Sequence, residues 1–222
     1  MLQNIEIETG TNPTHSIIWM HGLGADGNDF VPLVPELAIS NKVAIRFVFP
    51  HAPVQPVTIN GGMAMRAWYD ILVPSLVRQE DEAGILKSEQ AITALIEREI
   101  SRGIPSENIV LAGFSQGCAM TLHTGLRLKH RLAGLVGLSG YLPLAQSAPQ
   151  HWQDANRKTP IFLAHGSVDP VVTIDRGIAT RDLLVANGFD VRWHTYMMPH
   201  SVCPQEVDDI NAFLESVLTL RA

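Results

Sequence analysis

Cysteine and positive charge are both scarce in this sequence, and each scarcity excludes a class of protein. The 222 residues include two cysteines, Cys118 and Cys203. Two are too few for a disulfide framework, and they lack the paired spacing of a structural zinc site. We therefore expect two reduced thiols and no bound metal. The 16 Lys and Arg are outnumbered by 22 Asp and Glu, so no basic surface for nucleic acid is indicated.

Long apolar runs are also missing near the N-terminus. Residues 1–14 carry acidic and polar side chains and no stretch typical of a secretory signal or a membrane-spanning helix. This absence predicts a cytoplasmic location without integral membrane insertion. The composition, 46% hydrophobic and 17% charged, is typical of a folded globular protein, and no internal repeat is present. We expect residues 1–222 to form one domain.

Short β-rich apolar runs alternate with amphipathic stretches along the whole chain. This order is typical of an α/β fold, in which helices cover both faces of a mostly parallel sheet. Two connections, 50–84 and 140–159, are longer than usual and follow strand ends, where such sheets bind ligands. The expected strands are 16–20, 44–49, 109–112, 132–138, 160–164 and 191–197, and the expected helices are 85–102, 116–128, 173–187 and 204–220.

A nucleophile motif lies between an expected strand and an expected helix. The apolar run 109–112 leads into Gly113-Phe114-Ser115-Gln116-Gly117. In a Gly-x-Ser-x-Gly elbow the serine lies in a sharp strand-to-helix turn, and the glycines remove Cβ atoms that would clash there. The helix N-terminus favours the negative charge that develops during acyl transfer. We therefore predict that Ser115 is a nucleophile. Ser139, which also follows an expected strand, lacks the second glycine and is interpreted as a turn residue.

A serine hydroxyl needs a histidine to take its proton and a carboxylate to orient that histidine. In this fold the chain order is serine, acid, histidine. Among nine histidines, His200 fits the order, because it lies between the last expected strand and the last expected helix. Asp169 follows the strand before and is the predicted acid, with a helix cap as the alternative role. The other candidates are interpreted as surface charges: Asp154, Asp175 and Asp190.

Acyl transfer also requires two N–H donors for the oxyanion. The residue after the nucleophile, Gln116, is the first predicted donor. The second is the amide of Leu23, in a glycine-rich loop at 21–27 that follows the first expected strand. A phosphate-binding loop is the rival interpretation of this loop. It is excluded because no Gly-Lys-Ser/Thr sequence and no lysine occur between residues 17 and 41.

Seven motifs in this order resemble the phospholipase/carboxylesterase family of α/β hydrolases, which includes acyl-protein thioesterases and bacterial carboxylesterases. The motifs are His21-Gly22-Leu23-Gly24, Trp68-Tyr69-Asp70-Ile71, Glu80 to Ile85, the serine motif, Leu138 to Pro143, Gly166 to Val172, and His200. The resemblance implies an α/β-hydrolase fold without a large cap, and it agrees with the triad and oxyanion assignments above. It further implies an acyl-binding surface around residues 68–85, for which the candidate residues are Trp68, Ile71, Leu72, Val73, Leu76 and Tyr141. Ordinary loop packing is the alternative for these apolar residues.

The leading hypothesis is a serine carboxylesterase that hydrolyses esters of short to medium acyl chains through an acyl-enzyme, without metal or organic cofactor. Acyl-protein thioesterase and lysophospholipase activities stay open, so the substrate is an acyl ester or thioester, with lipids and acylated proteins as candidates. The alternatives are a non-catalytic module that binds a ligand in the same crevice, and a lyase or perhydrolase with the same triad. Monomer and homodimer are both open.

Overall fold

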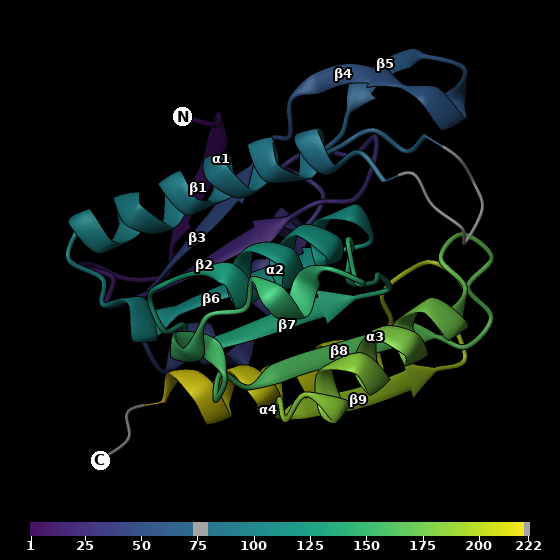
Figure 1. The fold of residues 1–222 in the computed structure, drawn as a ribbon. Coiled ribbons are helices and arrows are strands. Elements are labelled where there is room, and N and C mark those ends of the chain that lie inside the picture. The colour runs from purple at the N-terminus through teal and green to yellow at the C-terminus, as the bar shows by residue number, and fades with distance from the viewer. Residues whose placement is uncertain (73–79, 220–222) are drawn as a thin grey trace.

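The computed structural model describes residues 1–72 and 80–219, which are built around one central sheet (Figure 1). Seven strands lie in the order β1-β3-β2-β6-β7-β8-β9, and all pair in parallel except β1, which is antiparallel to β3. The strands are β1 (Asn4–Glu8), β2 (His15–Met20), β3 (Ile45–Pro50), β6 (Ile109–Phe114), β7 (Gly134–Leu138), β8 (Ile161–Gly166) and β9 (Val191–Tyr196). Because the parallel strands share one direction, their carboxyl ends meet at one edge of the sheet.

Helices cover both faces of the sheet (Figure 1). The side chains of α1 (Glu82–Ser101), α2 (Gln116–Arg127) and α3 (Ile174–Ala186) join one buried cluster with the strands. On the opposite face α4 (Pro204–Leu218) joins a second cluster with the 3₁₀ turns η1 (Val31–Glu36) and η2 (Ala38–Asn41). Further 3₁₀ turns are η3 (Thr58–Asn60), η4 (Ser106–Asn108), η5 (Ala148–Gln150) and η6 (Asp154–Asn156). The α/β-hydrolase fold without a large cap is confirmed.

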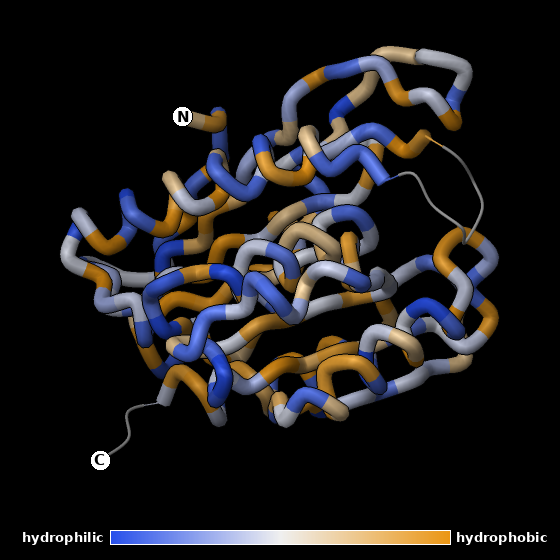
Figure 2. Tube along the Cα trace, viewed as in Figure 1, coloured by the Kyte–Doolittle hydropathy of each residue, from blue (hydrophilic) through white to orange (hydrophobic). Residues whose placement is uncertain are grey.

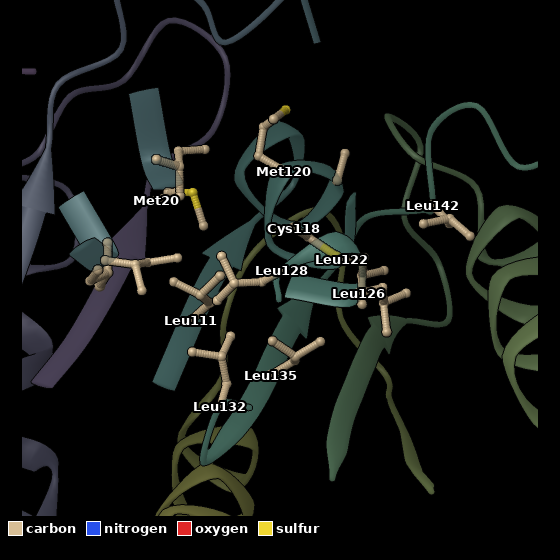
Figure 3. Close-up of a cluster of buried hydrophobic side chains, with 14 of the residues drawn as sticks. Met20, Leu111, Cys118, Met120, Leu122, Leu126, Leu128, Leu132, Leu135 and Leu142 are labelled. Atoms are coloured by element: carbon tan, nitrogen blue, oxygen red, sulfur yellow. The ribbon is translucent and has the colours of Figure 1, made fainter. Parts of the chain in front are cut away.

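The alternating direction of side chains along the strands explains why a hydrophobic core lies on each face of the sheet. In β2, Ile18 and Met20 pack toward α1 and α2, whereas Ile17 and Trp19 pack toward α4. Successive strand side chains point to opposite faces, so a strand that is apolar throughout is buried on both sides. Figure 2 shows these apolar residues concentrated in the centre of the molecule. Figure 3 shows Cys118, Leu122 and Leu126 of α2 lying over the strand residues Leu111 and Leu135.

Three strands were not expected from the sequence. In the edge strand β1, Ile5 and Ile7 pack against the core and alternate with Glu6 and Glu8. Two apolar residues are too few to form a clear strand pattern in the sequence. Arg46 of β3 pairs with Glu8 (Nε to Oε1, 2.8 Å) and with the fully buried Glu99 of α1 (Nη1 to Oε2, 3.0 Å), which ties the edge strand to the helix layer.

The other two strands, β4 (Val54–Val57) and β5 (Met63–Arg66), form an antiparallel hairpin inside the long connection 50–84. It extends above α1 in Figure 1. Four of its eight strand residues are exposed and only Val57 is buried, so no continuous apolar face marks it in the sequence. Within the described ranges, no helix is long and apolar enough to cross a membrane.

Candidate active site

Ser115 lies in the turn between β6 and α2, where the backbone adopts a conformation that side chains rarely take. Its φ is 55° and its ψ is −116°. The Ser115 N–H donates to the Leu138 carbonyl on β7 (2.8 Å), which anchors the turn to the neighbouring strand. A non-glycine residue with positive φ costs free energy that the surrounding structure must supply, and such residues cluster at functional sites. The structure therefore holds the serine at the carboxyl end of the sheet, at the first turn of α2.

The two motif glycines are required by close packing. A Cβ on Gly113 would lie 2.3 Å from the Gly117 carbonyl oxygen, and one on Gly117 would lie 2.2 Å from the Met20 carbonyl oxygen. Both distances are far inside van der Waals contact with backbone atoms that cannot easily move. The glycines therefore allow α2 to start against β6 and β2, as the elbow interpretation predicts.

Asp169 and His200 are joined by a short hydrogen bond at the carboxyl ends of adjacent strands. The Nδ1–H of His200 donates to Oδ2 of Asp169 (2.6 Å), and the Asp169 side chain is fully buried. The other carboxylate oxygen, Oδ1, accepts the backbone N–H groups of Val171 (2.8 Å) and Val172 (2.9 Å). Three donors thus surround the carboxylate, which satisfies its charge and fixes its orientation. Because Nδ1 carries the donated proton, Nε2 of His200 is left as the proton acceptor.

The His200 ring also lies against the nucleophile turn. It contacts the ring of Phe114, the residue before Ser115, with 4.7 Å between ring centroids. His200 itself is half-buried, with 16% of its side-chain surface exposed. The structure thus brings the predicted base, the predicted acid and the nucleophile turn to the same edge of the sheet.

The Leu23 amide lies in a tight turn beside the serine. Ala25 N–H donates to the Gly22 carbonyl (3.3 Å), and Gly24 has a φ of 78°, which is why a glycine is needed there. A Cβ on Gly22 would lie 3.4 Å from the Ser115 Cβ, so the turn packs directly against Ser115. The backbone N–H of Gln116 opens α2, and the first N–H groups of a helix have no intrahelical acceptor. Both predicted oxyanion donors therefore flank Ser115.

His21 supports this turn, and the sequence interpretation missed it. Its Nδ1–H donates to the Gly22 carbonyl (2.7 Å), while its Nε2 accepts the backbone N–H of Ala52 (3.0 Å). Only a neutral imidazole can make both bonds. Burial lowers the pKa of His21, which favours that neutral form. The signal available in the sequence was the position of His21 at the end of a buried strand, directly before the glycine loop.

The side chain of Gln116 binds the connection that follows β5. Its Oε1 accepts the Trp68 backbone N–H (2.8 Å), and its Nε2 donates to the Tyr69 carbonyl (2.7 Å). Trp68 is buried, with 1% of its surface exposed, and its indole N–H donates to the His21 carbonyl (2.9 Å). Trp68 thus packs next to the turn that carries the Leu23 amide and connects it to residues 68–72.

The remaining acyl-site candidates lie where the two long connections meet. The hydroxyl groups of Tyr69 and Tyr141 are 3.0 Å apart, and the Arg176 guanidinium carbon lies 3.3 Å from the centroid of the Tyr141 ring. Ile71 and Leu72 are half-buried, and Ile71 packs against the core. Val73 and Leu76 lie outside the described residues.

The carboxylates that were not chosen as the acid are all exposed: Asp154, Asp175 and Asp190.

A second residue that the sequence interpretation missed is His165 at the end of β8. Its ring is buried, its Nε2–H donates to the Val172 carbonyl (2.7 Å), and burial lowers its pKa. It lies 3.7 Å from Oδ2 of Asp169, so it packs behind the acid and helps to shape the loop that follows β8.

Both cysteines are free thiols, and burial raises the pKa of Cys118 to about 12. Among the residues that the structure describes, no group of three His, Cys, Asp or Glu side chains could hold a metal ion.

A parallel sheet with a serine elbow, and a histidine and carboxylate at neighbouring strand ends, defines an α/β hydrolase of the serine type. The chain belongs to the phospholipase/carboxylesterase family, whose model matches residues 2–218. It is a serine hydrolase that acts on ester or thioester bonds.

Individual relatives agree with this family. The chain is 44% identical to acyl-protein thioesterase 1 of Neurospora crassa in an alignment of 212 residues that covers 90% of this chain and 86% of the relative. Among solved structures, it resembles acyl-protein thioesterase 2 of Zea mays with a TM-score of 0.87 and 28% identity, covering 98% of this chain and 100% of that one. Arabidopsis thaliana SOBER1 gives a TM-score of 0.87 at 30% identity, covering 92% and 99%.

Proposed function

We propose that Ser115, His200 and Asp169 form the catalytic triad of this hydrolase. The observation that carries the proposal is the 2.6 Å bond from His200 Nδ1 to the buried Asp169, with the His200 ring packed on the residue before Ser115. Asp169 holds the imidazole in the tautomer that leaves Nε2 free to take a proton, and it stabilises the imidazolium that forms.

The reaction proceeds through an acyl-enzyme in two steps. Ser115 Oγ attacks the carbonyl carbon of the ester or thioester while His200 takes its proton. His200 then gives that proton to the leaving alcohol or thiol, and the acyl group remains on the serine. Water enters, His200 takes its proton, and the attack releases the carboxylic acid and restores the serine.

The N–H groups of Leu23 and Gln116 stabilise the negative oxygen of both tetrahedral intermediates. These groups flank Ser115, and each is held by neighbouring bonds before substrate arrives. Donors that need no reorganisation during the reaction are usually the largest source of transition-state stabilisation in acyl transfer.

The substrate class is a carboxylic ester or thioester with a short to medium acyl chain. Ile71, Leu72 and Tyr141 border the acyl chain, with Trp68 supporting them from behind. The names of the relatives favour an acylated protein as the substrate, and a lysophospholipid is the second candidate. A non-catalytic binding module is the alternative function. It is disfavoured because ligand binding does not require the strained Ser115 together with the His200 and Asp169 pair.

A single domain over residues 1–222, a cytoplasmic location and the choice between monomer and homodimer stay predictions.

Covalent labelling of the intact protein with a fluorophosphonate, read by mass spectrometry, tests the triad. The expected result is one adduct on Ser115, none on Ser115→Ala, and slow labelling of His200→Ala. Hydrolysis of a p-nitrophenyl acyl ester should fall at least about a thousandfold in kcat for His200→Ala. Ser139→Ala is the matched control, since Ser139 also has a positive φ of 47° at a strand end but lies outside the triad. An unlabelled wild-type serine would refute the proposed function.

A further inference from the structure

A groove of about 480 Å³ lies beside the catalytic histidine, on the face of the sheet that α4 covers. One wall is η1 with the loop before it, and the other is the segment that joins His200 to α4. Val202 and Cys203, two and three residues after His200, line it. Phe30 lines the other wall and contacts Phe114 (5.9 Å between centroids), which in turn contacts His200 (4.7 Å). His200 does not itself line the groove, but Phe114 links it to the lining residue Phe30, so the groove lies near the proposed base.

The position of the groove fits the leaving group rather than the acyl chain. In the proposed mechanism His200 must donate its proton to the leaving oxygen or sulfur, so the leaving group lies on the His200 side of the scissile bond. The acyl-site candidates lie on the other connections, around Tyr69 and Tyr141. A leaving group that extends past His200 would enter the groove.

The groove has an apolar base and an acidic rim. Half-buried Phe30, Leu33, Val202 and Val207 form the apolar part. The charged lining residues are Asp29, Glu36 and Asp208, all of them exposed carboxylates.

Among the described residues, no cation pairs with this rim. The lining residues include no Lys, Arg or His. None of the three carboxylates appears in an ion pair within the part of the chain that the structure describes. The carboxylates are also too dispersed to hold a metal ion together with each other or with Cys203, since the described residues contain no such group. Spread over two walls, they complement several positive charges distributed along one partner.

We propose that this groove binds a basic polypeptide segment next to the acylated residue of a protein substrate. The inference rests on the proposed function, because it assigns the leaving group of that reaction. Aliphatic stems of Lys and Arg pack on the apolar base while their charged ends reach the carboxylates at the rim. The groove thereby selects acylated proteins with a cationic segment at the acyl site over those with a neutral or acidic one.

Hydrolysis of three acyl-cysteine peptides tests the proposal. The peptides carry the same acyl group and differ only in their flanking residues, which are lysine-rich, neutral or glutamate-rich. Every rate is divided by the rate of the same enzyme on a small acyl thioester, so that folding defects cancel. We expect wild-type kcat/KM to favour the basic over the neutral peptide by about tenfold at low salt, a preference that falls as salt screens the charges.

The variant Asp29→Asn/Glu36→Gln/Asp208→Asn should lose most of that preference. Its matched control, Glu97→Gln/Glu107→Gln/Asp154→Asn, removes the same number of exposed carboxylates outside the groove and should keep it. Equal rates of wild-type enzyme on all three peptides, a faster rate on the neutral peptide, or equal loss of preference in both variants would overturn the groove assignment. If the wild-type enzyme fails to hydrolyse the small thioester and esters alike, the proposed function fails instead.

Discussion

Replacing Glu206 by glutamine should stabilise the protein, and the gain should grow with pH. Glu206 lies in the first turn of α4 and is completely buried. Its burial, with a smaller contribution from the nearby Asp209, raises the pKa of the carboxyl from 4.5 to about 8. At neutral pH the folded protein therefore keeps a proton on Glu206 that the unfolded chain has released.

The magnitude follows from proton linkage. Between pH 4.5 and about 8 the unfolded chain binds fewer protons at this position, so the free energy of unfolding of the wild type falls as pH rises. Above that interval both states are ionised, and below it both are protonated. Each pH unit within the interval lowers the free energy of unfolding by about 1.4 kcal/mol, so the whole interval lowers it by at most about 5 kcal/mol. Glutamine has the shape of the protonated acid and nothing to ionise.

Urea unfolding of the wild type and of Glu206→Gln at several pH values measures this loss. Subtracting one free energy of unfolding from the other at each pH removes the contribution of all other titrating groups. The advantage of Glu206→Gln should be larger at pH 8 than at pH 5 by about 3 to 4 kcal/mol. Asp208→Asn, on the same helix but exposed, is the control and should show a small difference at both pH values. An advantage of Glu206→Gln that does not change with pH would refute the reasoning.

Three further predictions concern residues that support the site or the fold around it. His21→Phe should lower kcat by about a hundredfold with little change in KM, because the Leu23 amide loses its support; steady-state kinetics on a small ester checks this, and an equal rise in KM would contradict it. Gly117→Ala should fail to fold or lose several kcal/mol, because its Cβ would meet the Met20 carbonyl oxygen at 2.2 Å; native stability in urea would contradict the elbow packing. Glu99→Gln should cost about 3 kcal/mol by leaving buried Arg46 partly unpaired, whereas a loss below about 1 kcal/mol at neutral pH would contradict that role.

The parallel strands and the helices could be predicted because their physical signals are local. Strands such as β2 and β8 are buried on both faces, so they are apolar throughout. The α1 helix starts three residues before its apolar pattern suggests, because Asp81 caps it by accepting the Gly84 N–H. The edge strand β1 and the β4–β5 hairpin depend on long-range pairing or on exposed residues, and neither leaves a continuous pattern in the sequence.

The residues of the candidate site also differ in how far the sequence could predict them. Ser115, Asp169 and His200 could be predicted as a triad because each follows a recognisable strand in a fixed order. The supporting residues His21 and His165 could not, since their roles depend on bonds to Ala52 and Val172 backbone atoms that only the folded chain defines. The groove beside His200 is built from segments more than 160 residues apart, so no local motif announces it.

The side-chain bonds of Gln116 couple two parts of the site that an engineer would want to change separately. Its backbone N–H is a proposed oxyanion donor, and both ends of its side-chain amide hold the backbone of Trp68 and Tyr69. A change in the backbone of the proposed acyl-binding residues would therefore be transmitted to the proposed oxyanion donor. Loop exchanges that redesign selectivity should keep the 68–69 backbone in place, or they will alter turnover as well as preference.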